Sequence, residues 1–380
     1  MSFNDRDRFA SKRSLISPEN PRMGESSPQR PSIGAKTLLG DLLRQVSRSF
    51  FLTLRVLPSK IRPQVGLAYL FCRAADTIAD TDLISAQQRL SVLLFYRNQF
   101  LPSGPDREGL VGISRGFSGR ALPGEHALLE RLPECFDLLR SFDEADRQAI
   151  GELVRTLTQG MEMDLLSFPQ GRPGAPQALA GLEDLDRYTY FVAGCVGEFW
   201  TRICRGHVKG LRGWDLNRME SLGVRFGKGL QLTNVLKDIS LDLARGRCYL
   251  PGTLLERHGL KAEMLLDPGS RGTILPLVKE LAALALGHLE AGWGYCAAIP
   301  RSQVRLRSAC VWPLFFALAT LREILHSPSL LDPKRPVKIR RSAVYRIMVL
   351  SSVQIFSNTA LDFYFRILRR RLLRSLREAR

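Results

Sequence analysis

The chain has 380 residues, 45% of them hydrophobic, and carries a formal net charge of +18. This length and composition allow a substantial core, in one large domain or two ordinary ones. The seven cysteines are odd in number and never form a CxxC pair, and the five histidines show no HxxxH spacing, which argues against a disulfide framework and a zinc site. Buried thiols in a reducing compartment predict a cytoplasmic protein.

The periodicity of the chain predicts an all-α fold. Along most of the sequence apolar residues recur every three to four positions, while the regular alternation of strands is rare. Residues 1–33 have no such pattern and are rich in Ser, Pro, Arg and Asp, so we expect them to form a disordered basic arm. Residues 34–380 are then expected to form one all-α domain.

The first predicted helix begins at Ala35 and ends in the block SRSF. Ser47, Arg48 and Ser49 combine a cation with two hydroxyls at the end of this helix. That combination suits an oxyanion. Ordinary helix capping explains the two serines equally well.

The next helix is predicted to start near Pro63 and carries an acidic face. Arg73, Asp76 and Asp80 stand at offsets 0, 3 and 7 and therefore share one side of the helix. Because the run around them, from Leu67 to Ile78, is otherwise apolar, this acid pair is expected to point away from bulk water.

Between the acidic helix and the middle of the chain, the sequence predicts a loop and two helices. Residues 101–125 are dense in Gly, Pro, Ser and Arg and have no periodicity, which predicts a surface connection or a mobile lid. Helices are predicted from Glu125 to Leu139 and from Glu144 to Phe168, with a break at 169–177. Asp164, in the second helix, is expected to have a structural role more than a role in a cavity.

The helix that follows carries a tyrosine beside small residues. Tyr188 is followed by Ala193, Gly194 and Gly197, and each glycine inside a helix costs roughly 1 kcal/mol relative to alanine. The small residues allow either a close contact between helices or room for a bulky ligand. The periodicity leaves both interpretations open.

A second acidic face lies in the segment 227–251. Gln231, Asn234, Asp238 and Asp242 stand at offsets 0, 3, 7 and 11 of one predicted helix, which is expected to end near Gly246. One acid pair alone is most often a solvated face. Two pairs opposed across a bundle would repel one another unless cations were bound. Mg²⁺ prefers oxygen ligands and substrate phosphates, so the pattern predicts a diphosphate site.

The C-terminal part of the chain is strongly basic. From residue 334 to residue 380 there are 13 lysines and arginines and 2 acids, a net charge of +11. Helices are predicted at 277–298, 304–326 and 343–377. Within 360–380 the apolar stripe Leu361, Phe365, Leu368, Leu372 and Leu376 is flanked by arginines, which is typical of a helix on an anionic membrane or of a helix docked on the domain. No nucleic-acid module is present, so nucleic acid is not an expected partner.

Five blocks of the sequence resemble the squalene and phytoene synthase family, in order and with suitable spacing, over about residues 36 to 350. They are SRSF (47–50), DTIAD (76–80), YTYFVAGCVG (188–197), LQLTNVLKDISLD (230–242) and RGRCYLP (245–251). The resemblance implies a single helical bundle of the isoprenoid synthase type with a central cavity. It also implies Mg²⁺ as a cofactor and a prenyl diphosphate as the substrate.

The resemblance also implies roles for individual residues. Tyr188 would stabilise cationic intermediates or handle a proton, and it would act with the four aspartates as a catalytic residue. Where family members often have further acids, this chain has Ala79 and Leu241, so only the minimal ligand set is kept. The expected metal ligands are Asp76, Asp80, Asn234, Asp238 and Asp242. The expected substrate contacts are Ser47, Arg48, Ser49, Phe50, Arg73, Gln231, Asn234, Lys237, Arg247 and Tyr249.

A short block, PVKIRR (336–341), resembles one that helps squalene synthases bind NADPH, so Lys338 and Arg340 are expected cofactor contacts. No GxGxxG follows a strand, so a Rossmann site is not expected. The favoured function is the head-to-head condensation of two farnesyl diphosphates through presqualene diphosphate, with NADPH reduction to squalene. The alternatives are phytoene or dehydrosqualene synthesis without reduction, or a non-catalytic relative. A peripheral position on the cytoplasmic face of a membrane is expected from the basic C-terminal helix.

Overall fold

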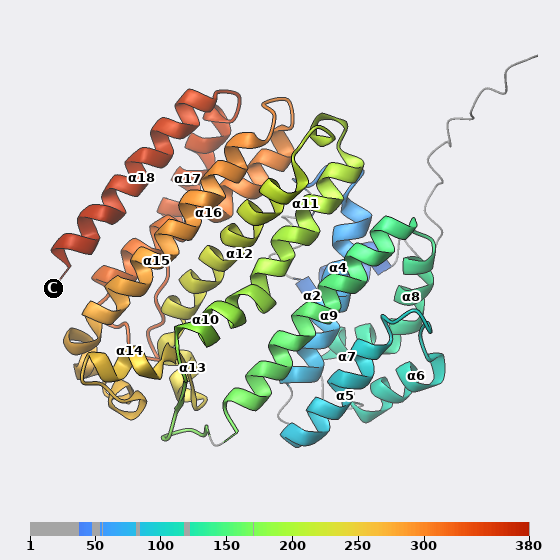
Figure 1. Ribbon diagram of the computed structural model, residues 1–380, viewed down its shortest axis with the longest axis horizontal. Helices are drawn as coiled ribbons and strands as arrows, with labels where there is room; N and C mark the ends of the chain where they lie inside the picture. The colour runs from blue at the N-terminus through green and yellow to red at the C-terminus, as the bar shows by residue number, and fades with distance from the viewer. Residues whose placement is uncertain are drawn as a thin grey trace, which may run out of the picture.

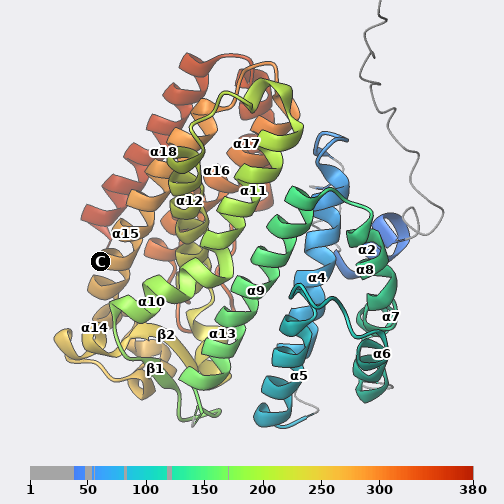
Figure 2. The ribbon, with the colours of Figure 1, turned by 45° about the vertical axis from the view of Figure 1, so that its right-hand side comes forward.

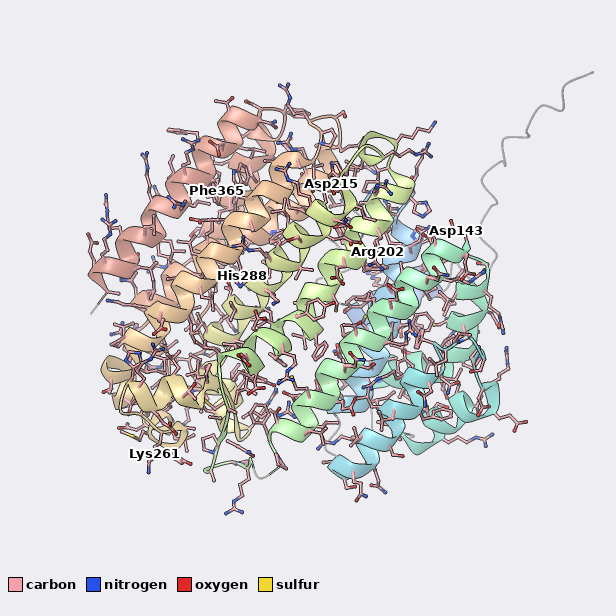
Figure 3. All side chains as sticks on the ribbon, in the orientation of Figure 1. Asp143, Arg202, Asp215, Lys261, His288 and Phe365 are labelled. Atoms are coloured by element: carbon pink, nitrogen blue, oxygen red, sulfur yellow. The ribbon has the colours of Figure 1, made fainter. Side chains whose placement is uncertain are left out.

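The structure is a computed structural model that describes residues 38–47, 54, 56–80, 84–117, 122–169 and 171–379. Within these residues nearly every element is a helix, and most of the long helices run side by side in one bundle (Figure 1). The predicted all-α fold is therefore confirmed. The side chains fill the space between the helices (Figure 3).

The first half of the described chain supplies one side of the bundle. In chain order it contains a π-helical turn and seven α-helices: η1 Leu38–Leu42, α2 Leu43–Ser47, α4 Arg62–Asp80, α5 Ala86–Asn98, α6 Arg107–Gly116, α7 Pro123–Glu130, α8 Leu132–Arg140 and α9 Glu144–Ser167.

The second half supplies the other side. Its longer elements are α10 Leu182–Thr189, the π-helical turn η2 Tyr190–Gly194, α11 Cys195–His207, α12 Leu216–Lys237, α13 Ile239–Ala244, α14 Gly252–Arg257, α15 Arg271–Ala298, α16 Val304–His326, α17 Arg341–Gln354 and α18 Asn358–Glu378. Three short 3₁₀ turns connect them: η3 Lys209–Leu211, η4 Ala262–Leu266 and η5 Pro268–Ser270.

Helix α12 packs closely against η2 and α11. A Cβ atom on Gly197 would overlap the carbonyl of Gly223, and one on Gly227 would overlap the carbonyl of Ala193. These backbones can approach so closely only because glycine has no side chain. The small residues after Tyr188 therefore serve helix contact, which decides between the two interpretations that the sequence left open.

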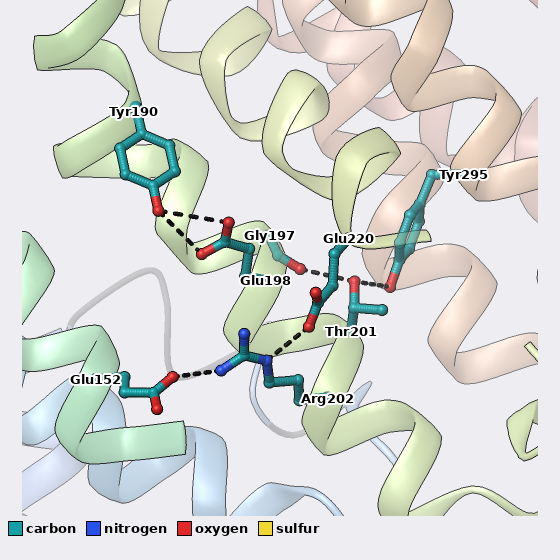
Figure 4. A network of polar contacts seen from close by, with 8 residues as sticks. All are labelled: Glu152, Tyr190, Gly197, Glu198, Thr201, Arg202, Glu220 and Tyr295. Atoms are coloured by element: carbon teal, nitrogen blue, oxygen red, sulfur yellow. Dashed lines mark hydrogen bonds and ion pairs between the residues drawn. The ribbon is translucent and has the colours of Figure 1, made fainter. Parts of the chain in front are cut away.

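A polar network joins α11 to the helices around it (Figure 4). Arg202 pairs with Glu152 of α9 and with Glu220 of α12, the latter at 2.6 Å. The hydroxyl groups of Thr201 and Tyr295, from α11 and α15, lie 3.1 Å apart. These contacts join α11 to α9, α12 and α15, and both α9 and α12 contribute residues to the cavity described below.

One predicted loop is wrong in extent. Most of the segment 101–125 is helical: α6 begins after Asp106, whose side chain accepts a hydrogen bond from the backbone N–H of Gly109 at 3.0 Å. Helix α7 begins at Pro123, where the missing N–H of proline costs nothing. The cap and the proline were readable signals, but the glycines and the short length of both helices hid their periodicity.

The two-stranded sheet was not predicted. Strand β1 (Gln177–Leu179) pairs in parallel with β2 (Arg247–Pro251) near α13 and α14 (Figure 2). Gly246 precedes β2 with φ +83°, a conformation that glycine adopts readily. A Cβ atom there would overlap the backbone of Arg172. The expected helix end near Gly246 is confirmed. The positive φ of this glycine turns the chain from α13 into β2.

The C-terminal helix is docked on the bundle. The single helix predicted at 343–377 is broken at 355–357, and Ser357 caps α18 by accepting a hydrogen bond from the N–H of Ala360 at 3.2 Å. Leu361, Phe365 and Leu372 of the apolar stripe are buried, and the ring of Phe365 (labelled in Figure 3) stacks on Trp293 of α15 at 4.7 Å. The expectation that this stripe contacts a membrane is therefore wrong, because the core covers it.

Two helices of the described chain are long and apolar enough to cross a membrane by length and composition. The candidate windows fall in α15 and α16, and 50% and 67% of their residues are buried inside the bundle. Core helices of this kind pass the same test. The seven cysteines are all free thiols, and all but Cys72 are buried, as predicted.

Candidate functional site

A cavity of about 410 Å³ lies where α4, α9 and α12 end. Its wall brings together both predicted acid pairs, Asp76 and Asp80 from α4 and Asp238 and Asp242 from the α12–α13 junction. The two pairs are more than 150 positions apart in the sequence. The fold thus makes one site from two distant segments.

The first acid pair lies in the last turn of α4. No basic residue stands in that turn, and the negative end of the helix dipole adds to the charge of the carboxylates. Arg73 approaches Asp76 at 3.8 Å but also pairs with Glu125 of α7. Because Arg73 is not part of the cavity wall, its predicted contact with substrate is not apparent in this structure.

The second acid pair follows a break in the helix. The prediction of one continuous helix from Gln231 to Asp242 is wrong. Helix α12 ends at Asp238, whose backbone has φ −101° and ψ 10°. The carbonyl of Asp238 still accepts the N–H of Asp242 at 3.0 Å, so the acidic face continues across the break. Gln231 and Asn234 line the same cavity. Lys237 does not, but its ammonium lies 3.1 Å from Asp238.

Two of the cavity acids have pKa values well above that of a free aspartate. Burial, followed by repulsion from Asp80, raises the pKa of Asp76 to about 7. Burial, followed by repulsion from Asp238, raises the pKa of Asp242 to about 7. The Asp76 side chain is nevertheless 44% accessible, because its open side faces the cavity. A carboxylate held in this way is stabilised by a cation and destabilised without one.

The donor set fits Mg²⁺. Four carboxylates and the amide oxygen of Asn234 offer only hard oxygen ligands around one cavity. The acids are spread around the wall: within the described residues, the only three acidic, histidine or cysteine ligand atoms within 4.8 Å of one another belong to Asp143, Asp146 and His207. Such spacing suits ions that each take one or two carboxylates and share a diphosphate, not one ion held by all four acids.

Besides the two acid pairs, the cavity wall contains a cluster of one acid, one arginine and two tyrosines. Asp164 of α9 pairs with Arg247 at 2.6 Å and accepts a hydrogen bond from the hydroxyl of Tyr249, while Tyr188 stacks on Tyr249 with ring centroids 4.6 Å apart. Burial raises the pKa of Asp164 and of both tyrosines. The sequence expectation undervalued Asp164, because α9 carries several other charged residues and Asp164 does not stand out among them.

The remaining wall is apolar. It includes Leu157, Met161 and Leu165 of α9 and Val192 of η2. The π-helical turn η2 begins two residues after Tyr188, and such turns are frequent at functional sites. A Cβ atom on Gly160 would crowd Val192, so this glycine lets α9 and η2 close one side of the cavity.

The predicted NADPH contacts are not brought to the cavity, and four other predicted site residues cannot be placed relative to it. Lys338 and Arg340 are exposed in the connection before α17 and do not line it. Ser47 ends α2, but its side chain lies outside the described residues, as do Arg48, Ser49 and Phe50. Arg245, which the sequence expectation did not include, does line the cavity.

Comparison with solved structures identifies the fold class. The complex structure of TcSQS with the ligand E5700 matches with a TM-score of 0.68 and 21% sequence identity, over 92% of this chain and 99% of that chain. A squalene synthase, HpnC, from Alicyclobacillus acidocaldarius matches with a TM-score of 0.54 and 20% identity, over 76% of this chain and 92% of that chain. The chain therefore has the all-α fold of the isoprenoid synthases.

Sequence comparison identifies the family. The family model described as squalene/phytoene synthase matches residues 43–343, and the chain belongs to this family. It is 25% identical over 320 residues to squalene synthase BSS of Botryococcus braunii, which covers 82% of this chain. The chain spans only 64% of that relative's length.

Proposed function

We propose that this protein is a Mg²⁺-dependent prenyltransferase that condenses two farnesyl diphosphates head to head through presqualene diphosphate. The observation that carries the proposal is the convergence of Asp76, Asp80, Asp238 and Asp242 on one cavity. Membership of the squalene/phytoene synthase family supports the reaction class. The presence of all four acids argues against a non-catalytic relative.

The acidic residues of the wall would hold the diphosphate through metal ions. Asp76 and Asp80 would bind Mg²⁺ on one side and Asn234, Asp238 and Asp242 on the other. Bound Mg²⁺ would supply positive charge to the diphosphate as it leaves an allylic carbon.

The cations of the chain would assist the same group. The ammonium of Lys237, 3.1 Å from Asp238, lies next to the proposed metal ligands. Arg247 is held at the wall by Asp164, with its remaining N–H groups available to phosphate oxygens.

The other wall residues would protect the reacting carbons. Leu157, Met161 and Val192 present apolar side chains to the cavity, which would keep water from a carbocation. Burial raises the pKa of Tyr188, so its hydroxyl keeps its proton. A neutral aromatic ring beside the reacting carbons can stabilise positive charge with its face.

We further propose squalene as the product, on the resemblance of the block 336–341 to that of squalene synthases. The NADPH contacts expected from it do not fit the cavity in this structure, because Lys338 and Arg340 are exposed and away from its wall. This separation favours a second candidate, in which the reaction ends at dehydrosqualene or phytoene. A bifunctional lycopene cyclase/phytoene synthase of Blakeslea trispora is 30% identical to the chain over 225 residues, 58% of this chain and 33% of that protein.

The test is product analysis after incubation with farnesyl diphosphate and Mg²⁺, with and without NADPH. Squalene formed only with NADPH supports the first candidate. Dehydrosqualene in both reactions, or phytoene from the longer geranylgeranyl diphosphate, supports the second. A protein that leaves every prenyl diphosphate unreacted, while folded and supplied with Mg²⁺, refutes both. When an acid of the cavity is replaced in the same assay, Asp146→Asn, which changes an acid outside the cavity, serves as the control.

A further inference from the structure

Helix α17 presents an apolar ridge to solvent. Tyr345, Val349 and Val353 are spaced four residues apart and are 66%, 61% and 75% exposed, and Phe356, in the turn after the helix, is 63% exposed. Residues at this spacing lie on one side of a helix. Four of the five most exposed large apolar side chains in the described chain thus belong to these twelve positions, which we name the α17 ridge. Single exposed apolar residues are ordinary, whereas a cluster marks an interaction surface.

The ridge is held outward by the opposite face of the helix. Ile347 and Ser351 are buried. The Ser351 hydroxyl accepts a hydrogen bond from the indole N–H of Trp312 on α16 at 3.0 Å. Because rolling the helix to cover the ridge would break this contact and expose Ile347, the ridge stays in solvent unless a partner covers it.

The charge around the ridge has one sign. Arg341 precedes Tyr345 by one turn and Arg346 follows it, and both are exposed. Between Lys338 and Leu361 the sequence contains no acid. Neither arginine pairs with any carboxylate that the structure describes within 4.0 Å.

We propose that the α17 ridge docks on an anionic lipid surface. Its apolar side chains would enter the boundary between head groups and acyl chains, and Arg341 and Arg346 would meet lipid phosphates. The surface differs from the α18 stripe, which the core covers. The proposal does not depend on the reaction proposed above.

The same observations disfavour other partners. In a symmetric contact with a second copy the ridge would meet itself, and each copy would bring its arginines towards those of the other without an acid between them. A single-stranded nucleic acid would need aromatic faces for stacking, but Val349 and Val353 in the centre of the ridge are aliphatic. An anionic bilayer matches both the hydrocarbon and the charge.

The test is flotation of the full chain with phosphatidylcholine vesicles and with vesicles that also contain about 30% phosphatidylglycerol. The wild type is expected to bind the anionic vesicles. The variant Tyr345→Ser/Val349→Ser/Val353→Ser should bind the anionic vesicles at least about tenfold more weakly than the wild type. The matched control is Leu122→Ser, which removes a side chain 57% exposed on another part of the molecule and should bind like the wild type. Arg341→Gln/Arg346→Gln should weaken binding to anionic vesicles only.

Three results would overturn the proposal. One is equal vesicle binding by the wild type and the ridge variant, or no binding by either. Another is a lipid-free dimer that the ridge variant converts to a monomer, which would assign the ridge to a second copy. The third is RNA binding that is lost with the ridge while vesicle binding is kept. Circular dichroism checks that each variant is folded, and the single variant Val353→Asp repeats the test if the triple variant is not.

Discussion

Two groups of acids lie at opposite ends of α9, and their partners differ. At the start of the helix, Asp146 is buried, accepts a hydrogen bond from Gln64 at 2.9 Å and lies 2.8 Å from His207. At the other end, Asp164 helps line a cavity that also holds Asp76 and three further acids. The 18 positions between Asp146 and Asp164 span roughly 27 Å of helix.

The difference separates an acid with a structural role from the acids that we propose bind a ligand. The charge of Asp146 is satisfied by side chains from α4 and α11, so the group needs nothing from outside. In the cavity, repulsion between the acids contributes to the raised pKa values of Asp76 and Asp242. Proximity of acids is therefore a poor guide to a metal site, whereas acids around a cavity without enough cationic partners are a better one.

The largest expected effect comes from neutralising a cavity acid. Asp76→Asn or Asp242→Asn should lower turnover of farnesyl diphosphate by at least about 100-fold, because charge on the leaving diphosphate is no longer compensated. The melting temperature should stay unchanged or rise, because one of two carboxylates that repel each other is removed. Steady-state kinetics and calorimetry on the same preparations measure both. Near-normal turnover would mean that these acids do not hold the metal.

The opposite pattern is expected at the other end of α9. Asp146→Asn should lower the free energy of unfolding by about 1–3 kcal/mol, because it weakens a buried hydrogen-bonded pair. Turnover at a temperature where the variant is folded should stay within about twofold of the wild type. Urea unfolding monitored by circular dichroism measures the change. A stable variant without activity would remove the distinction between the two groups.

An intermediate effect is expected at Asp164. Asp164→Asn should lower turnover by about tenfold, because Arg247 loses its carboxylate and Tyr249 loses a charged hydrogen-bond acceptor. Tyr249→Phe is the matched control, since it removes the hydroxyl and keeps the ring that stacks on Tyr188. Its loss of turnover should be smaller. If the two variants lose the same turnover, Asp164 acts only by accepting the hydrogen bond of Tyr249, and its ion pair with Arg247 does not contribute.

The smallest effect concerns pH. The hydrogen bond to Asp146 raises the pKa of His207 above its ordinary value. The folded state therefore binds this proton more tightly than the unfolded state, and the resulting stability is present at low pH and is lost as pH rises through the raised pKa. The free energy of unfolding should fall by roughly 1 kcal/mol or less between about pH 6 and pH 8. Urea unfolding across this pH range measures the decrease. In His207→Gln the decrease should be smaller, and an equal decrease would refute this cause.

The sequence was sufficient where a pattern and its environment agreed. Asp76 was predicted to point inward because the acid lies in an apolar run, and the structure places it at the cavity. Asp164 lies among other charged residues of α9 and has no second acid at helical spacing, so its part in the wall was undervalued. The break at Asp238 could not be predicted, because the acidic face keeps its spacing across it.

Periodicity also cannot identify what covers an apolar face. The stripe with Phe365 and the ridge with Val353 are both apolar faces in a basic segment, yet only the stripe is buried, against α15 and α16. The break at 355–357 lets α17 and α18 present different faces to the core. Only the tertiary packing shows which of the two faces remains exposed.

Binding of inorganic diphosphate tests the central claim most directly, since it needs no assumption about the prenyl chain or the product. Titration calorimetry should show diphosphate binding to the wild type only when Mg²⁺ is present. Asp76→Asn and Asp242→Asn, from the two sides of the cavity, should each abolish it, while Asp146→Asn should bind like the wild type. Wild-type affinity in either cavity variant, or binding without Mg²⁺, would contradict the account.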